Sequence, residues 1–255
     1  RRSISRARLS LSHLRQFFGT SVAADITSER IGAYVRFRMD DKDSPAKPAT
    51  VRRELSALRR MFTLAMQHGR IAYAPRFPRI AENNARTGFF ESEQFASVLD
   101  ELPVHLRPVA HFAYLTGWRR GEILSLRWAE VDFNHSTVRL EPGTTKNGEG
   151  RTFPFGTYPE LAALLREQRE SVRTLELSGG KVIPWVFVSA QGCQLADFYG
   201  AWRSACRRAG VPGRIFHDFR RTAVRNLERA GVPRSIAMKL TGQKTEAVYR
   251  RYAIV

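Results

Sequence analysis

Arginine, histidine and tyrosine side chains at the ends of expected elements are the residues of this sequence that could do chemistry. The motif TGWRRGE places Arg119 directly after a glycine turn, at the start of an expected helix. The motif FHDFRRT places His217 and Arg220 three residues apart, on neighbouring positions of one helix face. An arginine at a helix N-terminus adds its donors to free backbone N–H groups, so these positions suit an anion such as a phosphate.

A lysine and a tyrosine could complete a site for phosphoryl transfer. Lys146 is expected at the tip of a β-hairpin, from which its long side chain could reach a cleft. Attack on a DNA phosphodiester builds negative charge on the nonbridging oxygens, and two arginines can hold that charge. Lys146 could protonate the leaving 5′-hydroxyl, and a tyrosine hydroxyl helped by His217 could be the nucleophile. We expect neither a metal ion nor another cofactor, because this chemistry needs none.

Other kinds of site lack their motifs. Gly143 and Gly148 have the spacing of a phosphate-binding loop, but Glu149 follows where lysine is required. The sequence has no HExxH, paired CxxC, GxSxG or EF-hand pattern. Cys193 and Cys206 do not have the spacing of metal ligands. We therefore expect no metal site and no serine-hydrolase site.

The charge of the chain points to a polyanionic partner. Its 42 Lys and Arg residues against 24 Asp and Glu residues give a net charge of +18, so nucleic acid is the first candidate. Arginine is spread through the expected helices rather than gathered in one amphipathic segment, which disfavours a membrane-surface protein. No apolar run is long enough to span a membrane and no signal segment opens the chain. A cytoplasmic protein is expected.

The elements that must position these residues are helical in the first part of the chain. One expected helix ends near Gly19, a second spans 27–39 and a third spans 50–69, with Thr50 as its N-cap. Apolar residues of the third helix recur at spacings of three and four, which predicts one buried stripe. Residues 75–90 are rich in Pro, Asn and Gly without periodicity and are the expected interdomain linker.

Four arginines of the expected helix 50–69 pair at a spacing of seven residues, so that two turns present arginine in the same direction. They are Arg52, Arg53, Arg59 and Arg60. A solvated face is one interpretation of this pattern, and a surface that contacts DNA phosphates is the other.

The remainder of the chain predicts a small sheet among helices. Helical stretches lead to alternating runs at 131–142 and 151–156, which flank the turn-rich segment 144–150 and predict an antiparallel hairpin. Residues 185–189 look like a strand, and helical patterns continue from Leu195 to the end. The expected fold is mainly α with a small antiparallel sheet, of the α+β class.

Four motifs, in this order, resemble the catalytic domain of the tyrosine recombinase (phage integrase) family. They are TGWRRGE, TTKNGEGRTFP, HDFRRT and GQKTEAVYRRY. The resemblance covers residues 88–255 and implies an integrase-type catalytic domain there. Residues 1–80 resemble the family's helical core-binding domain, which binds DNA, through their position and helix pattern.

The resemblance assigns roles to the residues of the first three motifs. Arg119 is implied to be the first catalytic arginine, with Glu122 as its supporting carboxylate. Lys146 is implied to be the general acid. His217 and Arg220 are implied to be the catalytic histidine and the second catalytic arginine.

The last motif is implied to carry the nucleophile. Tyr252 lies nine residues after Gln243, which is the distance that the family keeps between its last phosphate-binding residue and its nucleophile. The family usually has histidine or tryptophan where Gln243 stands, and the amide of glutamine could donate the same hydrogen bond. Tyr249 falls at a position that is usually apolar, so it is expected to pack in the core.

The resemblance implies a site-specific DNA recombinase or integrase that cuts and rejoins DNA through a 3′-phosphotyrosyl intermediate, without metal or ATP. The implied partner is double-stranded DNA, bound by a homo-tetramer on two DNA sites, with a monomer or dimer when free. The protein is expected to be bacterial or phage-encoded and associated with DNA in the cytoplasm. Because the chain opens on Arg1, already inside an expected helix, it is interpreted as a piece of a longer protein.

Three alternatives remain open. Gln243 could mark a catalytically impaired relative that still binds DNA. The same chemistry could serve a type IB topoisomerase-like activity, which nicks and reseals one strand. A plain helical transcription regulator would explain the arginines but not the order and spacing of the four motifs.

Overall fold

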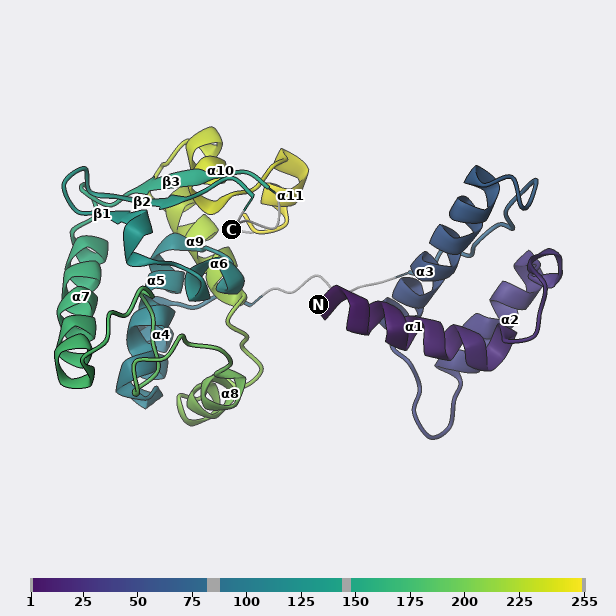
Figure 1. Ribbon diagram of the computed structural model, residues 1–255, viewed down its shortest axis with the longest axis horizontal. Helices are drawn as coiled ribbons and strands as arrows, with labels where there is room; N and C mark the ends of the chain where they lie inside the picture. Colours follow the sequence, from purple (N-terminus) through teal and green to yellow (C-terminus); the bar gives the residue numbers. More distant parts are fainter. Residues whose placement is uncertain (1, 82–87, 144–147, 254–255) are drawn as a thin grey trace. The chain divides into compact units, whose positions relative to one another are not determined.

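The computed structural model describes residues 2–81, 88–143 and 148–253. The chain divides into two compact units, Arg1–Asn84 and Ala85–Val255, each with its own hydrophobic core (Figure 1). No helix in the described ranges combines the length and the apolar character needed to cross a membrane.

The first unit is a small helical domain. Its elements are α1 (Arg2–Phe18), the 3₁₀ turn η1 (Ala23–Asp25), α2 (Ser28–Met39) and α3 (Pro48–Gln67). Helix α3 packs against both α1 and α2, and its predicted apolar stripe forms the centre of the core. The buried stripe consists of Val51, Leu55, Leu58 and Phe62.

The start of α3 differs from the prediction. Thr50 is not the N-cap, because the helix already begins at Pro48 and the capping position is Lys47. Proline suits the first turn of a helix, since the N–H that it lacks would have no partner there and its fixed φ is helical. The predicted threonine cap was therefore wrong by less than one helical turn. The predicted apolar stripe of α3 is present.

A buried ionic cluster joins α2 to α3. Glu54 accepts hydrogen bonds from Tyr34 Oη at 2.7 Å and from Arg38 Nε and Nη2, both at 3.1 Å. Glu54 and Tyr34 are fully buried and Arg38 nearly so. Buried charges are tolerated where each is paired and hydrogen-bonded, as here.

The second unit combines helices with one small sheet, as predicted from the sequence, and the sheet lies along one edge of the unit (Figure 1). The helices that precede the sheet in the chain are α4 (Ser92–Glu101), η2 (Val104–Leu106), α5 (Arg107–Thr116), α6 (Arg120–Leu124) and η3 (Trp128–Glu130). The strands are β1 (Val131–Asp132), β2 (Thr137–Leu140) and β3 (Arg151–Pro154). After the sheet lie α7 (Pro159–Gly179), α8 (Tyr199–Arg208), α9 (Asp218–Arg229), α10 (Arg234–Thr241) and α11 (Glu246–Arg250). The mainly helical fold with one small antiparallel sheet confirms the predicted fold class.

The sheet brings its last strand beside helix α10. The strand order is β1-β2-β3, and both pairs are antiparallel, with Val138 opposite Phe153 and Leu140 opposite Arg151. β3 contacts α10 (Figure 1), while α5 packs against α7 and α9. The hairpin and the C-terminal helices therefore meet around one region of this unit.

Aromatic rings hold the start of helix α9. The ring of Phe219, in the first turn, lies 4.8 to 6.1 Å from the centroids of five other aromatic rings. These rings belong to Phe90, Phe95, Tyr114, Trp202 and Phe216. Because aromatic packing at these distances is favourable, the cluster fixes the start of α9.

The segment 185–189 does not form the predicted strand. It makes only isolated bridges, at Trp185 and Val188. Its backbone is satisfied in other ways: Val186 N donates to Leu126 O at 3.0 Å, and Gln168 Nε2 donates to Val186 O at 2.7 Å. Val186, Phe187 and Val188 are buried, but the segment packs as irregular chain.

Candidate active site

The turn between α5 and α6 presents Arg119 to the start of α9. Gly117 ends α5 with a left-handed φ of +63°, a conformation that glycine adopts without steric cost. A Cβ at this position would come within 2.7 Å of the Ala223 Cβ on α9. Glycine therefore allows both the turn and the close approach of the two segments, and Arg119 follows as the capping residue of α6.

Glu122 holds the Arg119 guanidinium. Arg119 Nη1 donates to Glu122 Oε1 at 2.8 Å, and the Arg119 backbone N–H donates to Glu122 Oε2 at 3.0 Å. Burial by itself would raise the pKa of Glu122, but the charge of Arg151 and the hydrogen bonds from Arg119 outweigh it and lower the pKa. The carboxylate is therefore ionised at neutral pH and matches the fork of the arginine.

Arg220 is anchored at the C-terminal end of α10. Its Nη1 donates to Gly117 O at 2.9 Å and to Thr241 O, and its Nη2 donates to Gly242 O at 3.2 Å. Arg119 Nη2 donates to the same Gly242 carbonyl at 3.3 Å. Carbonyls at a helix C-terminus lack partners within the helix and carry partial negative charge, so this end attracts both guanidinium groups.

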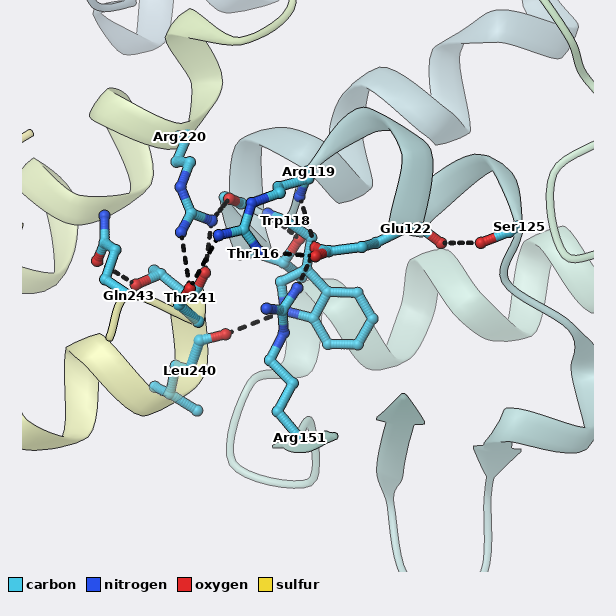
Figure 2. A network of polar contacts seen from close by, with 12 residues as sticks. Thr116, Trp118, Arg119, Glu122, Ser125, Arg151, Arg220, Leu240, Thr241 and Gln243 are labelled. Atoms are coloured by element: carbon cyan, nitrogen blue, oxygen red, sulfur yellow. Dashed lines mark hydrogen bonds and ion pairs between the residues drawn. The ribbon is translucent and has the colours of Figure 1, made fainter. Parts of the chain in front are cut away.

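The two guanidinium groups converge over residues 240–242, as Figure 2 shows. Burial, followed by the positive charge of Arg119, lowers the pKa of Arg220 to about 10. Arg220 thus stays charged at neutral pH although its side chain is buried. The result is a positively charged region between α6, α9 and α10.

Gln243 borders this region with a buried amide. Its side chain is only 6% exposed, and Oε1 lies 2.7 Å from Thr241 Oγ1. That hydroxyl also lies 2.7 Å from Ala237 O, so its single proton serves one of the two oxygens at a time. Nε2 has no hydrogen-bond partner within the described part of the chain, and Figure 2 draws it turned away from Thr241. A buried donor without a partner is costly, so this amide is suited to a ligand acceptor.

His217 and Tyr252 lie close to each other, and both lie near Arg220. His217 Nε2 lies 3.2 Å from Tyr252 Oη, and the Arg220 and Arg221 guanidinium carbons lie 5.6 and 5.5 Å from the centroid of the Tyr252 ring. Loss of hydration around the imidazole, and then the charge of Arg220, lower the pKa of His217. The imidazole is therefore neutral at pH 7 and able to accept a proton.

Tyr249 lies elsewhere, one turn earlier in α11. Its side chain is wholly buried in a small cluster with Val224 and Ala237. The ring fills the space between α9 and α10 and supports the segment that carries Tyr252. Its placement is that of a core residue.

The structure thus places most of the expected residues in one region of the second unit. Arg119, Glu122, His217, Arg220, Gln243 and Tyr252 come together from α6, α9 and the segment around α11. Lys146 lies outside the described residues. In the first unit, Arg52, Arg53, Arg59 and Arg60 are all exposed on α3, and Arg59 stacks over the Phe77 ring at 4.7 Å.

Comparison with known proteins identifies the family. The sequence profile of the phage integrase family matches residues 86–255, which is more than half of the chain. The chain belongs to the phage integrase family.

Curated members of the integrase family are similar to most of the chain. The integrase of Salmonella phage P22 is 27% identical over 226 residues, which cover 83% of this chain and 55% of that protein. The shufflon-specific DNA recombinase of Escherichia coli is 27% identical over 240 residues, covering 89% of this chain and 58% of that protein. The chain therefore spans little more than half the length of these relatives.

Solved integrase structures share the fold of the chain. The Tn1549 transposon integrase in complex with transposon right end DNA has a TM-score of 0.82 at 14% identity, covering 100% of this chain and 90% of that one. A lambda integrase dimer bound to a COC′ core site has a TM-score of 0.77 at 18% identity, covering 99% of this chain and 71% of that one. At such identities the likeness concerns the fold alone.

Sequence reasoning missed Trp118 and Arg151, two further residues of this candidate site. Trp118 Nε1 donates to Leu240 O at 3.0 Å, and Arg151 forms an ion pair with Glu122. Arg151 is part of the motif TTKNGEGRTFP, but only its place after the hairpin loop distinguished it from the many other arginines. No group of three or more His, Cys, Asp or Glu side chains that could hold a metal ion occurs in the described ranges.

Proposed function

We propose that this chain is the DNA-binding and catalytic part of a site-specific DNA recombinase that cuts and rejoins DNA through a 3′-phosphotyrosyl intermediate. The observation that carries the proposal is the 3.2 Å contact between His217 Nε2 and Tyr252 Oη, beside the charged guanidinium group of Arg220. Family membership and the names of the relatives, an integrase and a DNA recombinase, support it.

The scissile phosphate is proposed to bind between the two guanidinium groups. Arg119 and Arg220 use some of their N–H donors on Glu122 and on the carbonyls of α10, which fixes their orientation before DNA arrives. Donors left over on each planar fork then face the nonbridging oxygens, on which charge grows in the transition state. Gln243 Nε2 adds a neutral donor that has no other partner within the described residues.

Cleavage is proposed to proceed by in-line attack of Tyr252. The Oη–P bond forms as the P–O5′ bond breaks, and the phenol proton passes to the neutral His217 Nε2. The leaving 5′-oxygen takes a proton from Lys146, as implied by the family motif. The phosphotyrosyl bond retains the energy of the phosphodiester, so a 5′-hydroxyl can reverse the step, and we propose no role for ATP or a metal ion.

The first unit is proposed to be the core-binding domain and the second the catalytic domain. The exposed arginines of α3 would contact DNA phosphates, in keeping with the net charge of +18. We propose a homo-tetramer on two DNA sites and a monomer or dimer when free. A lambda integrase of similar fold has been solved as a tetramer bound to a Holliday junction, which supports this assembly. A cytoplasmic, DNA-associated location follows from the same proposal.

Covalent attachment to DNA tests the proposal. Salt-dependent footprinting on DNA from the borders of the encoding gene would supply the site, and a nick beside the scissile phosphate would trap the covalent complex. Wild type should become attached to the DNA, whereas Tyr252→Phe should bind DNA without attaching. Tyr199→Phe, at an exposed tyrosine of α8, is the matched control and should attach like wild type. A covalent complex that persists in Tyr252→Phe would overturn the assignment.

The same experiments separate the alternatives. A protein that footprints the site but never attaches would be a catalytically impaired DNA-binding relative. A protein that relaxes supercoiled DNA without exchange between two sites would be a type IB topoisomerase-like enzyme.

A further inference from the structure

Arg151 is a buried arginine beside the proposed phosphate site. It is the first residue of β3, and its side chain is only 8% exposed. Its guanidinium carbon lies 4.6 Å from the centroid of the Trp118 ring, a distance typical of a cation–π contact. Figure 2 shows the group between the indole ring and the carboxylate of Glu122.

Gly242 makes room for this guanidinium group. A Cβ built on Gly242 would overlap Arg151 Nη1 and crowd its guanidinium carbon. Gly242 also ends α10 with a left-handed φ of +69°. Glycine at this position is therefore favoured twice, once by the helix end and once by the approach of Arg151.

Arg151 and Arg119 share a single carboxylate. Glu122 Oε1 accepts from Arg119 Nη1 at 2.8 Å, while Oε2 accepts from the Arg119 backbone N–H at 3.0 Å and from Arg151 Nη2. Both oxygens are occupied, so the carboxylate cannot rotate without losing a charged partner. Arg151 thereby fixes the oxygen atoms that orient Arg119.

Arg119, Glu122 and Arg151 form a triad, and the charges of this triad matter as much as its geometry. If Glu122 faced Arg119 alone, the two charges would cancel beside the phosphate. With Arg151 present, two guanidinium groups share one carboxylate, and the triad keeps a formal charge of +1. Burial lowers the pKa of Arg151, and the charge of Glu122 opposes this effect. An arginine that is buried next to a second arginine costs free energy. The extra positive charge attracts an anion such as the scissile phosphate.

We infer that Arg151 is a positioning residue for DNA cleavage, which holds Glu122 and, through it, sets the orientation and the effective charge of Arg119 at the scissile phosphate. The inference rests on the proposed function and deepens it. Arg151 acts through other residues, because its Nη2 donates to Glu122 and its guanidinium plane is covered by Trp118.

The first test uses the charge of the scissile phosphate. Cleavage by wild type, Arg151→Met, Arg151→Lys and Arg119→Ala is measured on a phosphodiester and on a methylphosphonate, in which one nonbridging oxygen is replaced by an uncharged methyl group. We expect Arg151→Met to slow phosphodiester cleavage on the order of 100-fold, the typical effect of a small misplacement in an active site. Its defect should shrink on the methylphosphonate, as that of Arg119→Ala should, because less charge then needs to be held.

Arg151→Lys should lie between wild type and Arg151→Met, since lysine restores the charge but not the fork. It also keeps the inference testable if Arg151→Met does not fold. Arg139→Met is the matched control: Arg139 is exposed on the neighbouring strand β2, opposite Thr152, and this variant should behave like wild type. Equal loss of rate on both substrates would show a purely structural role and would overturn the inference.

The second test excludes an effect through the hairpin loop that precedes Arg151. A substrate with sulfur in place of the bridging 5′-oxygen has a leaving group that needs no proton, so it should restore cleavage to Lys146→Ala. The defect of Arg151→Met should persist on this substrate. Full rescue of Arg151→Met by sulfur would overturn the inference, because Arg151 would then act through Lys146. If wild type itself forms no covalent complex on any of these substrates, the proposed function fails, and the inference fails with it.

Discussion

At the scale of single residues, the proposed chemistry depends on two neutral groups that accompany the arginines. We propose His217 as a neutral acceptor for the proton of the nucleophile, and Gln243 as an amide donor where a histidine or tryptophan is usual in the family. The pH dependence of cleavage tests the role of His217, and substitutions test the role of Gln243.

The pH dependence of cleavage should follow His217. Its pKa is lowered from an ordinary value of about 6.5, so the neutral form persists at pH values at which an ordinary histidine is half protonated. The single-turnover cleavage rate should therefore be level from pH 8 to about pH 6.5 and decline only in more acidic solution. A half-maximal rate above pH 7 would contradict this role, and His217→Gln should remove the acidic decline while lowering the plateau.

Gln243→His should be neutral or activating. A neutral imidazole can accept from Thr241 Oγ1 with one nitrogen, as Oε1 does at 2.7 Å, and donate to the phosphate with the other. Gln243→Ala removes the donor and should slow cleavage about 10-fold, equivalent to about 1.4 kcal/mol. Single-turnover cleavage of the nicked substrate measures both. A marked fall in Gln243→His would show that the pocket is built around the amide.

At the scale of elements, the C-terminal end of α10 organises the site. Carbonyls of residues 240–242 accept from Trp118, Arg119 and Arg220, while Gly242 leaves space for Arg151. One helix end therefore connects α6, α9 and β3. None of these contacts could be predicted from the periodicity of α10, because they join segments far apart in the chain.

Gly242→Ala should disturb this centre more than its backbone strain alone would. A non-glycine residue at a left-handed φ costs about 1–2 kcal/mol. Gly210→Ala is the matched control, since Gly210 has a φ of +72° and no neighbour within 4 Å of its Cβ position. Both variants should lower the thermal midpoint, but only Gly242→Ala should also slow cleavage by displacing Arg151. Equal cleavage rates in the two variants would contradict the coupling.

The small helical unit depends on its ionic cluster. Glu54→Leu would leave Arg38 buried without its partner and Tyr34 Oη without its acceptor, which typically costs about 3–5 kcal/mol. Urea unfolding of the whole chain should show a first transition, from this unit, that moves to lower urea in the variant. Asp43→Leu, in the exposed loop before α3, is a control that should leave this transition in place.

At the scale of the whole molecule, charge should govern the proposed encounter with DNA. The net charge of +18 should give an affinity that falls steeply with salt, because each neutralised phosphate releases counterions. Replacing Arg52, Arg53, Arg59 and Arg60 with glutamine should weaken binding to all DNA sequences alike. The slope of log affinity against log salt should drop by about one for each phosphate that the four arginines neutralise in wild type. An unchanged slope would assign these four arginines to a solvated face.

The sequence by itself determined the class of fold and the identity of the motif residues. Local periodicity reports which face of a helix is buried, so the stripe of α3 and the helices around the small sheet could be predicted. It could not separate a buried strand from buried irregular chain at residues 185–189, because both are short apolar runs. The N-cap of α3 was misplaced because a helix that begins with proline needs no side-chain cap.

Only the tertiary structure decided how the motif residues are held. Glu122 and Arg151 are 29 residues apart, and Arg119 and Gly242 are 123 apart. Sequence patterns carry information over a turn or two, whereas these contacts arise when β3, α6 and α10 pack together. The spacing of the motifs thus selected Arg119, Arg220 and Tyr252. Packing of distant segments revealed that Arg151 shares the carboxylate of Glu122 with Arg119, and that the end of α10 holds both Arg119 and Arg220.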